Sequence, residues 1–202
     1  ISVWLGPDDT VLGVNAYLES QGLDPATEKI MCSGLNGTDA GVAALESGAE
    51  VTALCDTNGG MLPVEIADVV HAVHEATRGA LGIHCHNDTG CAVANSLAAV
   101  DAGIVHVQGT LNGYGERTGN ADLLAVVANL ELKLGRQVLP AGRLAEATRI
   151  AHAVSEVTNV PPYSRQPYVG ASAFAHKAGL HASAIKVDPD LYQHTDPTTV
   201  GN

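Results

Sequence analysis

Two histidines, two positions apart, are the residues of this sequence best suited to chemistry. His84 and His86 stand at the end of a short apolar run, residues 80–85, that has the composition of a β-strand. Because side chains alternate between the two faces of a strand, both imidazoles are expected to point the same way. Such a pair can hold one metal ion, whereas a single strand-end histidine often only makes a hydrogen bond. We interpret the pair as metal ligands.

A glycine-rich loop, residues 113–120, is a second candidate. It leads into a helical stretch, and at the start of a helix the backbone N–H groups and the helix dipole favour an anion or an oxygen ligand. Gly113 and Gly115 are therefore expected to contact substrate. Asn120 ends the loop and has two open interpretations, a helix N-cap or a metal ligand through its side-chain oxygen.

Other polar residues near these motifs have simpler interpretations. Glu116 and Arg117 either form a surface ion pair or belong to a backbone held against a bound group, as the flanking glycines indicate. Asp88 or Thr89 is expected to cap the helix that follows. Four further histidines are expected at the surface: His71, His74, His106 and His152.

The candidates follow a repeated pattern of secondary structure. Short β-branched or apolar runs predict strands, and Ala-rich stretches between them predict helices. The expected strands are residues 50–55, 80–85 and 104–108, and the expected helices are residues 63–77, 91–101 and 121–134. Three successive strand-loop-helix units indicate an α/β fold with a parallel sheet, in which the loops after the strands gather at one edge.

The pattern changes after residue 135. The sequence predicts one helix over residues 144–157, a proline-rich linker, and a short helix near residues 173–184. The N-terminal segment contains one predicted helix, residues 10–20, but does not repeat the unit. We therefore expect an N-terminal segment, an α/β domain and a small helical, partly irregular subdomain, over residues 1–36, 37–136 and 137–202.

Composition limits the function classes. The 202 residues include 10 Lys and Arg against 22 Asp and Glu, and the formal charge of −12 would repel nucleic acid. No apolar stretch approaches the roughly 20 residues that span a bilayer, and the first residues lack the pattern of a secretory signal. The four cysteines have no C-x-x-C spacing, which favours free thiols and a cytoplasmic location.

Four motifs, in order, resemble one enzyme family. They are Asp56–Pro63 (DTNGGMLP), Gly82–Gly90 (GIHCHNDTG), Ala92–Val100 (AVANSLAAV) and Val107–Asn120 (VQGTLNGYGERTGN). With the tail from residue 167, they resemble the isopropylmalate, homocitrate and citramalate synthase family over residues 38–202. The features most similar to its citramalate-forming members are Asn58–Gly60, Gln108–Thr110 and Tyr114.

The resemblance implies a fold and an activity. Family members have a TIM (β/α)8 barrel, of which this chain matches the C-terminal part, followed by a linker subdomain. They condense acetyl-CoA with a 2-oxo acid on a divalent metal, for which Mg or Mn is favoured over Zn, and then hydrolyse the thioester. For the citramalate-forming members the oxo acid is pyruvate, the pathway is isoleucine biosynthesis and the active form is a homodimer.

The motifs also imply roles for residues of the barrel. His84, His86 and Asn120 match the family's metal ligands by position. Thr57 resembles the residue at a strand end that meets the carboxylate of the oxo acid. The resemblance thus favours metal binding over capping for Asn120.

Two further pairs are implied by the same resemblance. His181 and Tyr192 resemble a pair that the subdomain delivers to the active site of the partner subunit, where they serve proton transfer. Glu116 and Arg117 resemble a pair that supports the metal and its loop. We treat all four as candidate catalytic residues.

The chain departs from the family in more than one respect, and residues 1–36 do not resemble the barrel segment expected there. Nothing in it matches the D-x-x-x-R-D-G strand that supplies a metal-binding Asp and a catalytic Arg, so we expect these 202 residues alone to be inactive. Isopropylmalate or homocitrate synthase is the alternative within the family. An inactive fragment or pseudoenzyme is the alternative of another class, and an aldolase-type lyase would not explain the tail.

Overall fold

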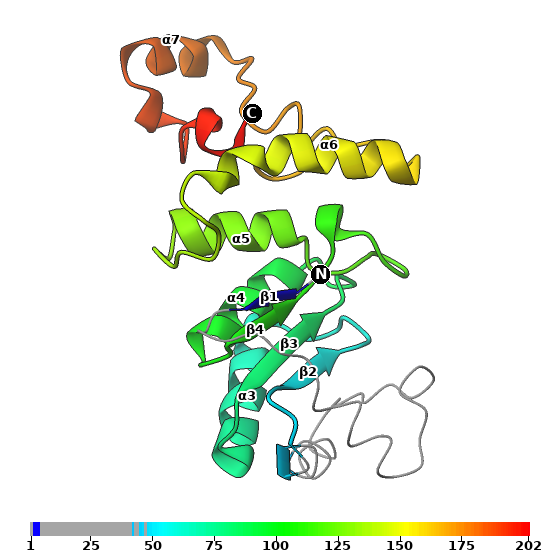
Figure 1. Ribbon diagram of the computed structural model, residues 1–202. Coiled ribbons are helices and arrows are strands. Elements are labelled where there is room, and N and C mark those ends of the chain that lie inside the picture. The colour runs from blue at the N-terminus through cyan, green and yellow to red at the C-terminus, as the bar shows by residue number, and fades with distance from the viewer. Residues whose placement is uncertain (1, 5–41, 43–44, 47) are drawn as a thin grey trace. The chain divides into compact units, whose positions relative to one another are not determined.

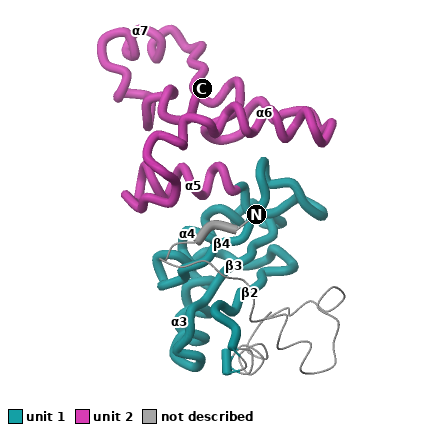
Figure 2. The backbone as a smooth tube through the Cα atoms, in the orientation of Figure 1, with its two compact units in different colours: residues 1–122 teal, residues 123–202 magenta. Residues whose placement is uncertain are grey.

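The computed structural model describes residues 2–4, 42, 45–46 and 48–202, which form parts of two compact units (Figure 2). Unit 1 spans residues 1–122 and unit 2 spans residues 123–202. The helix expected over residues 10–20 lies outside the described residues. Among the described residues, no helix has the length and apolar content needed to cross a membrane.

Unit 1 contains a sheet whose parallel strands alternate with helices (Figure 1). The chain runs through β2 (Thr52–Asp56), α3 (Pro63–Thr77), β3 (Leu81–Cys85), α4 (Ala92–Asp101) and β4 (His106–Gln108). β2 pairs in parallel with β3, and β3 pairs in parallel with β4. The α/β fold with a parallel sheet is therefore confirmed, and these elements differ from the predicted bounds by at most two residues at either end.

An additional strand, β1 (Ser2–Trp4), pairs with β4 in antiparallel orientation, with Ser2 opposite Gln108. The resulting strand order is β1-β4-β3-β2. This strand was not predicted. Because it runs antiparallel, it is not a further strand-helix-strand repeat.

Local sequence explains why α3 matches its predicted bounds. Pro63 occupies the first helical position, where no N–H is needed. Ile66, Val70 and Val73 recur at helical spacing and are buried. The helix ends at Arg78, whose left-handed backbone conformation lets its N–H donate to the carbonyl of His74.

The two faces of β3 differ in what they bury. Ile83 and Cys85 are buried in the core of unit 1, whereas His84, between them, is half-buried and belongs to the opposite face. In the parallel register His84 lies opposite Cys55 of β2 and Gln108 of β4. Cys55, Cys85 and Cys91 are free thiols, and burial raises the pKa of Cys85 to about 12.

Unit 2 is helical, with several short turns. Its elements are α5 (Leu123–Leu132), η2 (Arg143–Glu146), α6 (Ala147–Thr158), α7 (Gly179–Val187), η3 (Pro189–Leu191) and η4 (Pro197–Val200), and unit 1 adds η1 (Leu111–Gly113). The helix predicted over residues 144–157 is thus a 3-10 turn followed by α6.

The helix expected near residues 173–184 begins later, at Gly179. The preceding segment forms turns instead, in which the N–H of Ala173 donates to the carbonyl of Gly170. The side chain of Asn202 donates to the carbonyls of Tyr168 and Gly170 and holds this segment in place. Helical propensity alone therefore does not decide where this helix begins.

His106 is the one histidine of the expected surface set that is not at the surface. His71, His74 and His152 are exposed, as predicted. His106 is only 4% exposed. It faces Gly82 of β3, where a Cβ would lie 3.0 Å from its Nδ1 atom, so the glycine makes room for the ring. Burial lowers the pKa of His106.

Candidate functional site

The loops after β2, β3 and β4 lie side by side at one edge of the sheet, joined by backbone hydrogen bonds. The N–H of His86 donates to the carbonyl of Asp56 at 3.2 Å. The N–H of Asn87 donates to Gly119 at 2.9 Å, and that of Thr89 donates to Gly59 at 3.0 Å. The loop after β3 is therefore fastened to both neighbours, which is the arrangement that gathers functional side chains in parallel α/β folds.

The three residues predicted as metal ligands come together at this edge. The rings of His84 and His86 have centroids 5.3 Å apart. The side-chain amide nitrogen of Asn120 lies 3.0 Å from Nε2 of His84, and Asn120 also forms a β-bridge with His86. Since the nitrogen and oxygen of an amide side chain are interchangeable in such an assignment, the amide oxygen can occupy the same place.

The chemical state of these side chains suits a divalent cation. Burial first, and then the neighbouring His86, lower the pKa of His84, which favours the neutral imidazole that ligation requires. Nδ1 of His86 is buried and has no hydrogen-bond partner among the described residues. In that same part of the chain no third His, Cys, Asp or Glu completes the group. Two imidazoles and one amide therefore fit part of a metal site.

The glycines of the 113–120 loop pack around Asn120. The N–H of Asn120 donates to the carbonyl of Gly113 at 3.0 Å. A Cβ on Gly115 would overlap Oδ1 of Asn120, and Gly119 adopts φ +96°, which other residues rarely tolerate. The structure thus gives Gly113 and Gly115 a packing role at Asn120, and their contact with substrate stays a prediction.

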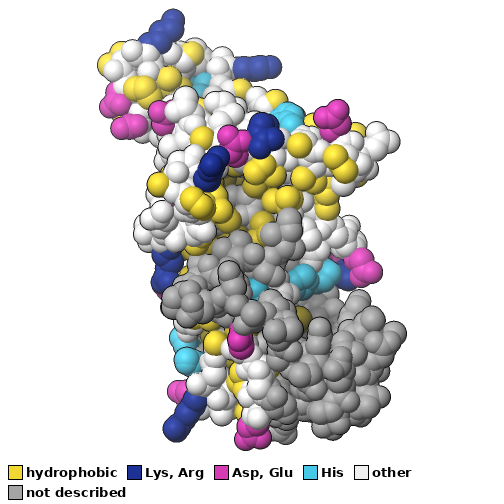
Figure 3. Space-filling model, viewed as in Figure 1, with side chains coloured by type: hydrophobic (Ala, Val, Ile, Leu, Met, Phe, Trp, Pro, Cys, Tyr) yellow, Lys and Arg dark blue, Asp and Glu magenta, His cyan; other side chains and the backbone are white. Residues whose placement is uncertain are grey.

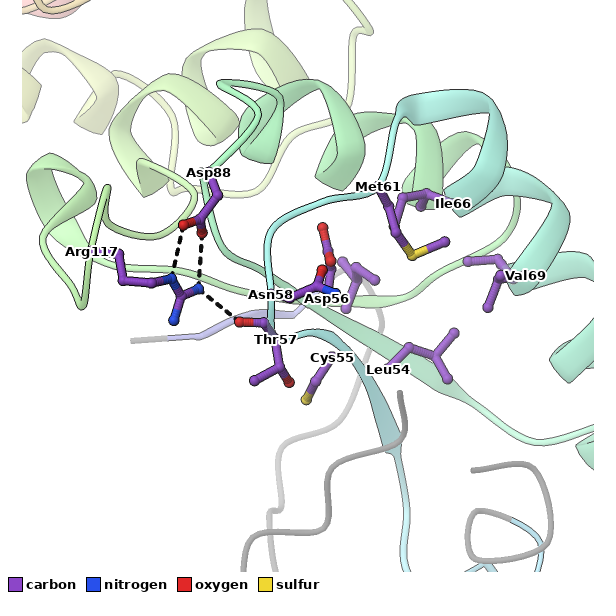
Figure 4. A pocket seen from close by; sticks show the side chains of 12 residues that line it. Leu54, Cys55, Asp56, Thr57, Asn58, Met61, Ile66, Val69, Asp88 and Arg117 are labelled. Carbon is purple, nitrogen blue, oxygen red and sulfur yellow. Dashed lines mark hydrogen bonds and ion pairs between the residues drawn. The ribbon is translucent and has the colours of Figure 1, made fainter. Parts of the chain in front are cut away.

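Asp88 does not cap α4, which corrects the sequence-based expectation. Its carboxylate accepts two hydrogen bonds from Arg117, at 2.8 and 2.9 Å (Figure 4). Arg117 holds the pKa of Asp88 below its usual value. Cys91 stands at the N-cap position, and Oδ1 of Asn87 accepts the N–H of Ala92, the first residue of α4, at 3.0 Å. Thr89 does not cap α4 either, because its hydroxyl donates to the carbonyl of Met61 at 3.4 Å.

Arg117 also reaches the loop after β2, where its Nη2 donates to the carbonyl of Thr57 at 2.8 Å (Figure 4). Thr57, Asp88 and Arg117 line one end of a hollow of about 680 Å³. Glu116 is exposed beside them, and the ion pair of Arg117 is made with Asp88. Asp56, to which no role was assigned from the sequence, lines the same hollow and has a buried Oδ2 without a partner among the described residues.

The two candidates in the tail also lie together, within unit 2. The ring of His181, in α7, stacks on the ring of Tyr192 with centroids 4.1 Å apart and an angle of 23°. His176 lies near both, with ring centroids 6.2 Å from His181 and 6.4 Å from Tyr192. No pattern in the sequence singles out His176, because a spacing of five residues from His181 matches neither helical nor strand periodicity.

Comparison with protein families identifies both parts of the chain. A family model described as HMGL-like matches residues 34–154, and one described as homocitrate synthase post-HMGL domain-like matches residues 168–202. The first match covers more than half of the chain.

Two individual synthases are similar in sequence to this chain. (R)-citramalate synthase of Streptomyces coelicolor is 70% identical over 159 residues, which cover 79% of this chain and 30% of that protein. 2-Isopropylmalate synthase of Sulfurisphaera tokodaii is 41% identical over 161 residues, with 79% of this chain and 41% of that protein covered. The chain therefore spans well under half the length of these curated relatives.

Among solved structures, an HMG-CoA lyase from Acinetobacter baumannii in complex with coenzyme A and 3-methylmalate superposes with a TM-score of 0.57. Its sequence identity is 22%, and the match covers 71% of this chain and 48% of that one. At this identity the likeness concerns the fold alone. It confirms that the chain has the fold of part of a TIM barrel.

Proposed function

Because the chain belongs to the HMGL-like family, we propose that it forms the metal-binding part of an acyltransferase that condenses acetyl-CoA with pyruvate to give citramalate. The reaction is of the Claisen type, and the thioester is hydrolysed to release CoA. The observation that carries the proposal is the convergence of His84, His86 and Asn120 beside the Thr57 loop. Isoleucine biosynthesis and a cytoplasmic location belong to the same proposal.

His84, His86 and Asn120 would hold the metal, with Mg or Mn favoured and Zn possible on the chemistry of this donor set. The chemistry supplied by a divalent ion held there would be Lewis-acid polarisation of the ketone of a 2-oxo acid. Thr57 is proposed to bind the carboxylate of the oxo acid. It follows β2 directly, at the sheet edge where His86 donates its N–H to the carbonyl of Asp56.

His181 and Tyr192 are proposed to move protons during condensation. An imidazole titrates near neutral pH, and a phenol can donate a hydrogen bond to an enolate oxygen. Their stacked contact keeps the two groups at one place in unit 2. We propose that they serve the site of a partner subunit in a homodimer.

Exposed apolar side chains support this homodimer. Figure 3 shows one face of the molecule, on which hydrophobic side chains gather over α6. The exposed large apolar residues of unit 2 include Val157, Val160, Tyr163, Leu180, Val187 and Leu191. Apolar side chains left open to water are available for contact with another chain, and a contiguous patch of them marks an interaction site.

The test is an assay of the complete gene product that contains this chain. CoA release from acetyl-CoA is measured with pyruvate, 2-oxoisovalerate or 2-oxoglutarate, and the product is identified by mass spectrometry. We expect kcat/KM to be highest with pyruvate and turnover to be lost in His84→Ala. Preference for 2-oxoisovalerate or 2-oxoglutarate would favour isopropylmalate or homocitrate synthase, and no turnover of any oxo acid would contradict the proposal.

A further inference from the structure

We propose, on the basis of the function proposed above, that Asp88 and Arg117 are a positioning pair that sets the affinity for the 2-oxo acid by holding the backbone of the Thr57 loop. The pair acts through Thr57 and makes no contact with substrate itself. It therefore affects binding of the oxo acid more than binding of acetyl-CoA.

The pair joins three loops that are far apart in sequence. Arg117, in the loop after β4, donates from Nε and Nη2 to both carboxylate oxygens of Asp88, in the loop after β3. The same Nη2 donates to the carbonyl of Thr57, in the loop after β2. A planar guanidinium that makes paired hydrogen bonds has a defined orientation, which a lysine in its place would not have.

The backbone around the pair is shaped to bring the loops this close. Arg117 adopts φ +57°, an uncommon conformation for a residue with a side chain. Gly59, at φ +65°, lies so near Asp88 that a Cβ would be 2.7 Å from its backbone nitrogen. The N–H of Thr89 donates to the carbonyl of Gly59 in the same region. The chain therefore adopts two left-handed conformations where these loops meet, one at a glycine and one at a residue that carries a side chain.

Stability and positioning can both follow from this arrangement. The side chains of Arg117 and Asp88 are 43% and 26% exposed, and an ion pair open to water usually contributes only modestly to stability, although bidentate geometry raises its contribution. The hydrogen bond from Arg117 holds the carbonyl of Thr57 in place. The side chain of Thr57 is held with it. Small displacements of a substrate-binding group are costly to an enzyme, since a shift of about 1 Å can reduce the rate roughly 100-fold.

Three variants of the complete gene product test the proposal: Arg117→Lys, Asp88→Asn and the double variant. Arg149→Ala serves as the matched control, because Arg149 forms an exposed ion pair with Glu146 in unit 2. We expect each variant to raise KM for pyruvate about tenfold or more, with KM for acetyl-CoA within about twofold of wild type. The double variant should be no worse than either single one, because both remove the same contact.

A second measurement does not depend on turnover. Hydrogen exchange of the amides at residues 57–60 should be faster in all three variants and unchanged in Arg149→Ala. If the complete gene product turned over no oxo acid, this measurement would still decide whether the pair holds the loop, so the two proposals can fail separately. Unchanged exchange in the variants would overturn the positioning role. So would a raised KM in Arg117→Lys with none in Asp88→Asn, because that result indicates direct contact of Arg117 with substrate.

Discussion

Nε2 of His84 lies 3.0 Å from the side-chain amide of Asn120, although 36 positions separate the two residues in the chain. His84 belongs to β3, and Asn120 follows the glycine-rich loop after β4. The contact thus joins two neighbouring strand-loop units at the sheet edge. An imidazole and an amide oxygen placed this way can share one divalent ion, which makes the contact testable.

Removing one of these groups should weaken metal binding. We expect His84→Ala to lower the affinity for Mn²⁺ at least about 100-fold, since loss of an outer-shell partner alone costs about 10–100-fold. Titration calorimetry of the complete gene product with MnCl₂ measures the effect. His71→Ala, on the exposed side of α3, is the control and should bind as wild type does. Equal affinity in His84→Ala and wild type would show that the metal site lies elsewhere.

The glycine at position 115 should be required for the placement of Asn120. An alanine Cβ there would overlap Oδ1 of Asn120 and lie 2.9 Å from its Cγ. We therefore expect Gly115→Ala to displace the amide and weaken Mn²⁺ binding about 10-fold or more. Gly179→Ala meets no atom within 4 Å and should leave Mn²⁺ binding unchanged. Full affinity in Gly115→Ala would mean that Asn120 is not a ligand.

Burial of His106 should make stability depend on pH. Burial lowers the pKa of His106 from the ordinary 6.5, so the unfolded chain takes up a proton at a higher pH than the folded protein does. The contribution of neutral His106 to the free energy of unfolding is therefore fully present above about pH 6.5. It is lost as the pH falls from there toward the lowered pKa of the folded protein. Urea unfolding at pH 7.5 and 5.5 measures the free energy of unfolding. Its decrease between the two pH values should be smaller in His106→Gln than in wild type.

The control for this pH dependence is His152→Gln, because His152 is exposed. It should lose as much stability between the two pH values as wild type does. An equal loss in His106→Gln would show that His106 is not responsible for the pH dependence.

The proposed composite sites predict complementation between two inactive variants. When complete gene products carrying His84→Ala and His181→Ala are mixed, a heterodimer would contain one site with both an intact His84 and an intact His181. We expect each variant to be inactive alone and the mixture to regain activity as subunits exchange. Native mass spectrometry verifies the exchange. If heterodimers formed without activity, the delivery of His181 to a partner subunit would be refuted.

Much of unit 1 could be predicted from sequence because local patterns decided it. Pro63 and the buried stripe of Ile66, Val70 and Val73 are enough to define α3. The alternation of side chains along a strand predicted that His84 and His86 share a face, and their rings do lie together. These rules involve residues within a few positions of one another, so no knowledge of the tertiary structure is needed.

Other features were decided only by residues distant in the chain. Asp88 had the sequence context of a helix cap, but Arg117, 29 positions away, binds its carboxylate, and the side chain of Asn87 accepts the first N–H of α4 instead. His106 is buried because β4 sets it against Gly82 of β3. The short range of helix and strand preferences lets a sequence determine its elements, whereas the partner of a polar side chain depends on which loops the folded sheet brings together.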